Sequence, residues 1–263
     1  MSNSLKEIVK ERYTTAVKSG GTCGCTPDCC TPDLNVIFMD DDYKKLEGYQ
    51  EIADHGLGCG LPTKLADIQQ GDTVLDLGSG AGNDVFIARR QVGETGKVIG
   101  VDFTEAMLEK ANENKAKLGF QNVEFVLGDI EELPVATGSV DVVISNCVMN
   151  LVPDKNKAYR EVFRVLKPGG HFSIADVVLT ADLPKGIQEA AEMYAGCISG
   201  AIEKKVYMDI IQQAGFRDVK IMKEHKIQLP DELLLKHISM EELNAYRMHE
   251  SAIMSITING KRP

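Results

Sequence analysis

The nine residues Asp-Leu-Gly-Ser-Gly-Ala-Gly-Asn-Asp (76–84) decide the fold of this chain. They follow a short apolar run at 73–77, and they place three glycines at alternate positions directly before a stretch of helical character at 84–91. Glycine has no Cβ, so the backbone can turn tightly and approach a ligand closely there. The segment therefore predicts a strand, a glycine-rich binding turn and a helix.

Short apolar runs and helical stretches alternate over the following hundred residues. Further strands are predicted at 97–102, 122–127, 139–145 and 170–178. Helices are predicted at 84–91, 105–117, near Glu131 and at 155–166. Strict alternation is typical of an α/β protein with a doubly wound parallel sheet that helices cover on both faces. Ligands of such sheets bind beyond the carboxyl ends of the strands.

The two ends of the chain follow other patterns. Residues 186–195 and 204–214 look helical, 219–222 could form a strand, and the tail at 255–259 alternates like an edge or added strand. The first 20 residues also look helical. They lead into 20–32, where Gly, Pro and Cys without periodicity predict a surface loop.

Composition limits the classes of function. The chain has 263 residues, 43% of them hydrophobic and 26% charged, which is typical of an ordinary globular protein. Its net charge of −10 does not suit a nucleic-acid binder, so a neutral or cationic small ligand fits better. No apolar run is long enough to span a membrane, and the charged amino terminus does not resemble a signal peptide. We therefore expect a cytoplasmic protein with no membrane or nucleic-acid partner.

Acidic residues accompany the glycine turn. A dinucleotide-binding loop would have its third glycine at position 83, where this chain has Asn83, so a pyrophosphate site is the weaker interpretation. Asp76 ends the first strand, and Asp102 closes the second, where ribose hydroxyls are usually bound. Asp129 follows the third strand. Carboxylates at these positions favour a ligand that has hydroxyl and amine groups and no phosphate.

The Asp-x-Gly-x-Gly-x-Gly pattern resembles motif I of class I S-adenosylmethionine methyltransferases, whose cofactor carries a sulfonium and no phosphate. The resemblance implies a Rossmann-like fold, with the adenine amine facing the position of Asp129. The cofactor contacts that it predicts are Asp76, Gly78, Gly80, Asn83, Asp102, Phe103, Gly128, Asp129, Ile130 and Asn146.

Seven cysteines suggest a second kind of site. Four lie between residues 23 and 30, and the others are Cys59, Cys147 and Cys197. An odd count argues against a complete disulfide framework, which leaves thiols for metal binding or redox chemistry. Each cysteine alone is typical of a small buried apolar residue. If the fold brings the three separate ones together, they form a soft site that suits trivalent arsenic better than structural zinc, which would need a fourth ligand.

Three segments with these cysteines make the resemblance more specific: Gly-Leu-Gly-Cys-Gly-Leu-Pro (56–62), Ser-Asn-Cys-Val-Met-Asn-Leu-Val-Pro-Asp-Lys (145–155) and Gly-Cys-Ile-Ser-Gly-Ala (196–201). From about residue 43 to 215 the chain resembles the arsenite S-adenosylmethionine methyltransferase family, especially its short microbial members. The resemblance implies methyl transfer to arsenic held by Cys59, Cys147 and Cys197.

The resemblance also implies a redox step, in which Cys59 later pairs with an amino-terminal cysteine. Cys30 is the favoured partner and Cys29 the next. Cys23 and Cys25 could equally form a small metal clip or be redundant thiols. A cellular thiol reductant such as thioredoxin or glutathione would be a co-substrate.

On this interpretation, residues 1–60 form an amino-terminal helix and a cysteine-bearing loop, 61–180 form the S-adenosylmethionine-binding domain, and 181–263 complete the sheet and form an annex over the arsenic site. Arsenite and methylated trivalent arsenicals would be the substrates. Two alternatives stay open: a methyltransferase for a carbon, oxygen or nitrogen acceptor with incidental cysteines, and a thiol-based arsenic or soft-metal binding protein without turnover.

Overall fold

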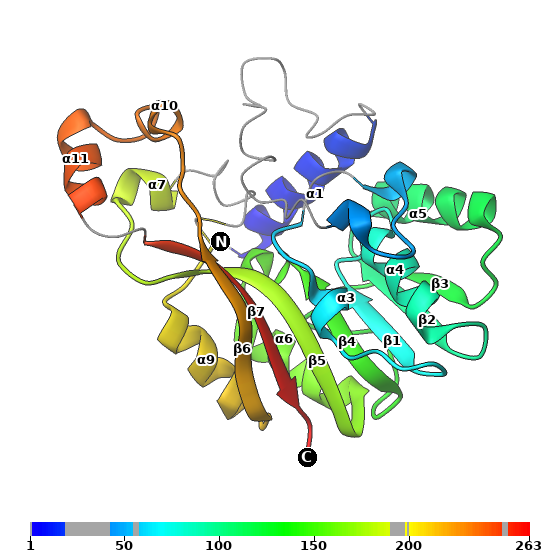
Figure 1. Ribbon diagram of the computed structural model, residues 1–263. Helices are drawn as coiled ribbons and strands as arrows, with labels where there is room; N and C mark the ends of the chain where they lie inside the picture. The colour runs from blue at the N-terminus through cyan, green and yellow to red at the C-terminus, as the bar shows by residue number, and fades with distance from the viewer. Residues whose placement is uncertain (1, 19–42, 55–57, 190–197, 199, 249–251) are drawn as a thin grey trace.

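A single mixed sheet organises the computed structural model, which describes residues 2–18, 43–54, 58–189, 198, 200–248 and 252–263 (Figure 1). Among these residues the sheet has seven strands in the order β3-β2-β1-β4-β5-β7-β6. The strands are β1 Thr73–Leu77, β2 Lys97–Asp102, β3 Val123–Leu127, β4 Val140–Asn146, β5 Leu166–Leu179, β6 Arg217–Lys226 and β7 Ile253–Lys261. β1 to β5 are mutually parallel, and β7 is antiparallel to both of its neighbours. The predicted doubly wound α/β sheet is confirmed.

Helices cover both faces of the sheet. The α-helices of the described residues are α1 Ser2–Lys18, α3 Pro62–Leu65, α4 Asn83–Val92, α5 Glu105–Leu118, α6 Lys155–Val165, α7 Lys185–Glu189, α9 Lys204–Gln213, α10 Asp231–Leu234 and α11 Met240–Met248. Short 3-10 turns lie at η1 Tyr43–Lys45, η2 Glu51–Ala53 and η3 Met149–Leu151. Val74 of β1 packs with α4 on one face, whereas its neighbour Leu75 packs with α6 and α9 on the other. This alternation follows from the two-residue period of a strand and buries β1 on both sides.

One predicted element needs correction, and the structure decides between two alternatives for another. The helix expected near Glu131 is a turn, in which the Asp129 carboxylate accepts a hydrogen bond from the backbone N–H of Glu131 at 2.9 Å. Such a side-chain bond competes with helix formation. The tail strand is an added strand but not an edge strand, because β7 lies between β5 and β6 and is buried on both faces. Of the helix predicted at 186–195, α7 covers the first part, and residues 190–197 lie outside the described residues.

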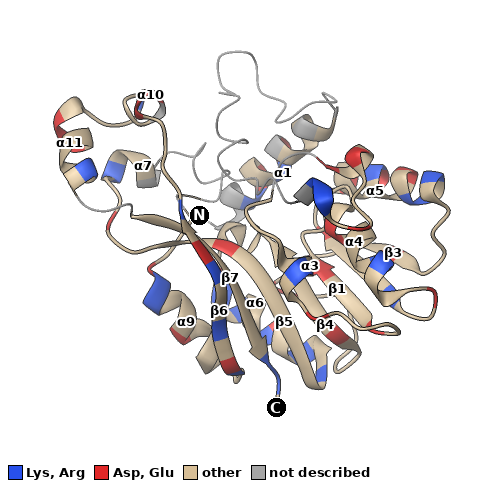
Figure 2. Cartoon of the chain, viewed as in Figure 1, with Lys and Arg blue, Asp and Glu red and all other residues tan. Residues whose placement is uncertain are grey.

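β6 is the edge strand in place of β7. Lys220, Lys223, Glu224 and Lys226 are exposed along it, and Figure 2 shows these charges over the strand. Charged side chains on an edge oppose pairing with another sheet. No helix within the described residues is long and apolar enough to cross a membrane.

An apolar cluster lies at the carboxyl ends of the parallel strands. It joins Val9 of α1 and both Cys59 and Cys147 to side chains of α7, α10 and α11. In Figure 1, α1 lies across this end of the sheet. The chain after residue 181 therefore supplies two strands of the sheet and also packs around the two cysteines. The domain boundaries at residues 60 and 180 stay a prediction.

Candidate functional site

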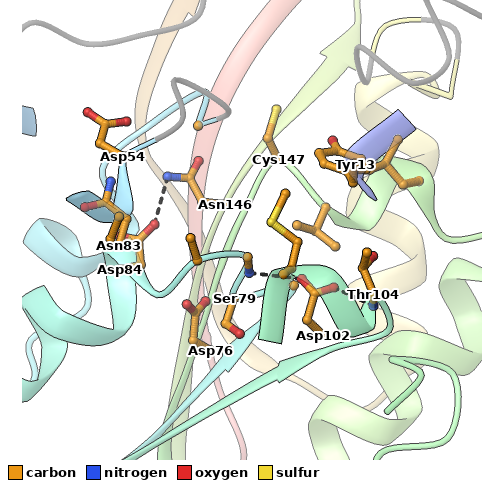
Figure 3. Close-up of a pocket in the computed structure, with 18 of the residues that line it drawn as sticks. Tyr13, Asp54, Asp76, Ser79, Asn83, Asp84, Asp102, Thr104, Asn146 and Cys147 are labelled. Carbon is orange, nitrogen blue, oxygen red and sulfur yellow. Dashed lines mark hydrogen bonds between the residues drawn. The ribbon is translucent and has the colours of Figure 1, made fainter. Parts of the chain in front are cut away.

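A pocket opens at the carboxyl ends of β1, β2 and β4 (Figure 3). Its unfilled space of about 910 Å³ includes space open to solvent, so it is a cleft in the surface and not an enclosed cavity. The predicted cofactor residues that line it are Asp76, Gly78, Gly80, Asn83, Asp102, Phe103 and Asn146. A second pocket shares Gly78, Asp102 and Phe103 with the first, so the two adjoin. The remaining predicted residues, Gly128, Asp129 and Ile130, line the second pocket.

The glycine turn forms one wall of the pocket. Gly78 has φ +67°, and its N–H donates to the carbonyl oxygen of Val101 at 2.8 Å, so the turn continues the pairing between β1 and β2. A Cβ at this position would lie 2.5 Å from the Val148 side chain. Both the backbone angle and the close approach therefore require glycine.

Asp102 fixes the opposite side of the turn. Its carboxylate accepts hydrogen bonds from the N–H of Gly80 at 2.9 Å and from the N–H of Thr104 at 2.8 Å. Burial raises the pKa of this carboxyl, and the two backbone donors oppose the rise. The carboxylate is thus held at the pocket wall by the backbone of both flanking loops.

Asp76 and Asp84 add two further buried acids. Burial first, and then the nearby carboxylates of Asp84 and Asp102, raise the pKa of Asp76 well above its ordinary value. Figure 3 shows these three acids entering the pocket from different elements. A bound cation would relieve their mutual repulsion, so the pocket favours a positively charged ligand.

Helix α1 covers the second pocket, a contact that no pattern in its residues indicates. The Lys6 ammonium donates to the Asp129 carboxylate at 2.6 Å and also pairs with Glu131. Burial raises the pKa of Asp129, but hydrogen bonds from Lys6 and from the N–H of Glu131, together with the charges of Lys6 and Lys157, give a net downward shift. Tyr13 of the same helix lines the first pocket. The first residues of the chain thus contribute to both pockets.

The structure brings Cys59 and Cys147 together from segments 88 residues apart. Their sulfur atoms and a carboxylate oxygen of Asp176 all lie within 4.8 Å of one another. Both cysteines are buried, and Cys147 also lines the first pocket. The N–H of Cys147 donates to the carbonyl oxygen of Ala175 at 2.8 Å, and its φ of +60° is unusual for a residue other than glycine.

Asn146 positions the segment that carries Cys59. Its side-chain oxygen accepts from the N–H of Cys59 at 2.9 Å, and its amide nitrogen donates to the carbonyl oxygen of Gly60 at 3.0 Å. The Ser255 hydroxyl of β7 donates to the carbonyl oxygen of Cys59 at 2.7 Å. The cysteine is therefore held by β4 and β7 together.

Five predicted residues cannot be placed. Cys197, Cys30, Cys29, Cys25 and Cys23 lie outside the described residues, so the third arsenic ligand and the redox partner stay predictions.

Asp176 of β5 belongs to this cluster, and the sequence analysis missed it. Its carboxylate accepts from the N–H of Val177 at 2.9 Å and from the Tyr207 hydroxyl at 3.0 Å, and Tyr207 accepts in turn from Tyr159 at 2.9 Å. Burial raises the pKa of Asp176 to about 7. One signal could have indicated it, because an aspartate inside the apolar run Ile-Ala-Asp-Val-Val (174–178) must be buried with partners.

Comparisons with known proteins bear on the whole site. A family model described as a methyltransferase domain matches residues 68–215. An arsenite methyltransferase from Aquipseudomonas alcaligenes is 34% identical, and the alignment covers 98% of this chain and 74% of that protein. The chain belongs to the arsenite methyltransferase family.

Two further members of the arsenite methyltransferase family support the assignment. One from Halobacterium salinarum is 43% identical over 227 residues, which cover 82% of this chain and 58% of that protein. The crystal structure of an arsenic(III) S-adenosylmethionine methyltransferase from Chlamydomonas reinhardtii is 32% identical, with a TM-score of 0.64, and covers 88% of this chain and 73% of that one. The chain thus spans about three fifths to three quarters of the length of these relatives. Its fold is the predicted Rossmann-like fold of class I methyltransferases.

Proposed function

We propose that this protein transfers a methyl group from S-adenosylmethionine to trivalent arsenic held by cysteine thiolates. One observation carries the proposal: the sulfurs of Cys59 and Cys147 lie within 4.8 Å of each other at a pocket whose other wall is the glycine turn. Family membership supports the same chemistry, because the relatives are named for arsenite methylation.

The residues of the first pocket fit S-adenosylmethionine. Gly78 leaves room where a Cβ would meet Val148, and three buried acids suit a sulfonium cation with hydroxyl and amine groups. When bound, the cofactor supplies a methyl group activated by the positive sulfur. We assign Asp102 to the ribose hydroxyls, and Phe103, Asp129 and Ile130 to the adenine end, where the second pocket lies.

The protein's own contribution is mainly positioning. Cys147 forms part of the pocket wall, so arsenic bound to its sulfur would face the cofactor pocket. The nucleophile is the arsenic lone pair, which needs no deprotonation, so no general base is required. Alignment of arsenic with the methyl group and exclusion of water by the apolar cluster around the cysteines would supply most of the rate.

Two roles extend this proposal to residues outside the described ones. Cys197 supplies the third sulfur, and Cys30, or Cys29 in its place, forms a disulfide with Cys59. Methyl transfer oxidises arsenic to the pentavalent state, and the two electrons released by disulfide formation reduce it again. A thiol reductant such as thioredoxin or glutathione then regenerates the thiols, and we propose that this occurs in the cytoplasm.

Two other functions were open from the sequence. A methyltransferase with a carbon, oxygen or nitrogen acceptor would not need both sulfurs, and Cys59→Ser or Cys147→Ser would leave its turnover nearly intact. A thiol-based binding protein would hold arsenite without forming a methyl product. The arsenite methyltransferase relatives and the paired sulfurs beside the pocket favour the arsenic methyltransferase over both.

The decisive experiment is arsenic speciation by mass spectrometry after incubation with arsenite, S-adenosylmethionine and a dithiol. Methylated arsenic is expected for the unaltered protein, with a loss of at least about tenfold for Cys147→Ser and Cys59→Ser. Cofactor binding by calorimetry serves as the control and should persist in both variants. An arsenic pool that remains unmethylated with the unaltered protein would remove the proposal.

A further inference from the structure

Asp176 gives the pair of cysteines a third donor atom that an arsenic site with three thiolates does not call for. The sulfurs of Cys59 and Cys147 and one Asp176 oxygen lie within 4.8 Å of one another, and all three side chains are almost fully buried. They come from the segment before α3, the end of β4 and the interior of β5. The cluster is therefore a feature of the tertiary fold and not of one local motif.

Two sulfurs and one carboxylate oxygen form a donor set for a particular class of ion. Thiolates select thiophilic centres, and Zn²⁺ accepts both Cys sulfur and carboxylate oxygen in tetrahedral sites with an open fourth position. Tetrahedral coordination places such ligand atoms about 3.6–3.8 Å apart, given Zn–S near 2.3 Å and Zn–O near 2.1 Å. The three atoms are within 4.8 Å now, so an inward shift of about 1 Å completes the geometry.

The charge of the three side chains favours the same class of ion. When deprotonated as ligands, two thiolates and a carboxylate would carry three negative charges in an apolar cluster, and a divalent cation would leave a net charge of about −1. The carboxylate is also held in place, because Val177 and Tyr207 each donate to one of its oxygens. Partners of this kind orient metal ligands in known sites.

We propose that Cys59, Cys147 and Asp176 form a binding site for a thiophilic divalent cation of the Zn²⁺ and Cd²⁺ class, with the fourth position taken by water. The cation would occupy the two sulfurs that the proposed function gives to arsenic, and so would exclude arsenite. Only this inhibition rests on the proposed function.

The binding test uses the full chain with Cys23, Cys25, Cys29, Cys30 and Cys197 replaced by Ser, so that only the two clustered thiols remain. Cd²⁺ is titrated in the presence of a phosphine reductant, and the thiolate-to-cadmium charge-transfer band reports binding. One Cd²⁺ per chain is expected. Asp176→Asn in this background should weaken binding at least about tenfold, whereas Asp141→Asn, which removes a carboxylate near the amino end of β4, away from the cluster, should leave the affinity unchanged. Equal affinities of the two variants would overturn the site.

A second variant, Asp176→Cys, tests the site if Asp176→Asn does not fold, because it should strengthen the charge-transfer band. Asp176→Cys places a third sulfur at the cluster, so the charge-transfer band per bound Cd²⁺ should grow by about half. An unchanged band would mean that residue 176 does not face the metal, and the proposal would be wrong. Circular dichroism checks the fold of each variant.

The inhibition is measured separately on the chain with all seven cysteines. Cd²⁺ should raise the apparent KM for arsenite, and Asp176→Asn should need at least about tenfold more Cd²⁺ for the same effect. Cadmium binding without any methylated arsenic would refute the proposed function and leave the metal site standing. If the chain with all seven cysteines methylates arsenic but the chain with five of them replaced by Ser binds no cadmium, the metal site is refuted and the proposed function stands.

Discussion

The side-chain oxygen of Asn146 accepts a hydrogen bond from the backbone N–H of Cys59 at 2.9 Å, so the residue before one cluster cysteine positions the other. The amide nitrogen of Asn146 donates to Gly60 and, at 3.1 Å, to Asp84 at the start of α4. One amide therefore joins the end of β4, the Cys59 segment and the helix that follows the glycine turn. The spacing of the two sulfurs depends on this connection.

Asn146→Ala should lower the stability of the protein and raise its KM for arsenite. The substitution leaves the buried N–H of Cys59 without its acceptor, which costs about 1–3 kcal/mol of stability. We also expect the KM for arsenite to rise several-fold, because Cys59 loses its fixed position. Chemical denaturation and initial rates of arsenic methylation measure the two effects.

Asn259→Ala is the matched control for that variant. Asn259 donates to the carbonyl oxygen of Leu65 at 2.6 Å, so the control also removes an amide-to-backbone bond, but away from the cluster. Its stability should fall by a similar amount while the KM for arsenite stays unchanged. If both variants keep the original KM, Asn146 has no positioning role.

Gly78→Ala should lower the free energy of unfolding by more than the strain of its backbone angle accounts for. Gly78 and Gly119 have nearly equal φ values, +67° and +71°, but only at Gly78 would a Cβ meet a neighbour, Val148 at 2.5 Å. Gly119→Ala should therefore lower the free energy of unfolding only by the strain of the positive φ, about 1–2 kcal/mol. Gly78→Ala should lose more, and it should also weaken S-adenosylmethionine binding, which Gly119→Ala should not. Denaturation and calorimetry test this, and equal losses would contradict it.

Local signals explain which parts of the fold could be predicted. The strands β1 to β4 and the second half of β5 are short apolar runs, and the turn after β1 has glycines at positions where φ is positive, so both can be recognised within about ten residues. Asp102 ends β2 and Asp129 follows β3, and because these strands pair in parallel their carboxyl ends lie together. These features need no knowledge of distant contacts.

Contacts between distant segments explain what was missed. β7 pairs with β5 although about 80 residues separate them, and its apolar alternation does not say whether both of its edges are paired. Lys6 reaches Asp129 across 123 residues, and no pattern in the first helix indicates this partner. Asp176 lies in an apolar run that predicts a buried strand but not the neighbours of its one acid.

Asp102→Asn should weaken cofactor binding strongly. An amide nitrogen cannot accept a hydrogen bond, so the variant loosens the turn at Gly80 or Thr104 and also loses a bond from the ribose hydroxyls that we assign to Asp102. A hydrogen bond to a charged group is worth about 1.5–3 kcal/mol. The expected rise in the dissociation constant of S-adenosylmethionine is therefore roughly 10- to 150-fold.

Asp141→Asn is the matched control for Asp102→Asn. Asp141 also accepts from a backbone N–H, that of Thr73 at 2.9 Å, but it lies near the amino end of β4, away from the pocket. Its cofactor affinity should be unchanged. Calorimetry on the two variants gives the comparison, and similar affinities would show that Asp102 does not shape the binding turn.

Stability should fall between about pH 4 and 7 because of Asp176. Its carboxyl faces Tyr207 of α9, Lys155 of α6 and the thiols of Cys59 and Cys147, and burial raises its pKa from 3.8 to about 7. Over that interval the native state keeps a proton that the unfolded chain has lost, so the free energy of unfolding decreases as pH rises, by as much as about 4 kcal/mol. Asp176→Asn cannot ionise and lacks this dependence. Urea denaturation of both proteins across this range should give a difference that shrinks with rising pH and levels off above about pH 7, and a constant difference would mean that Asp176 is ionised in the folded protein throughout.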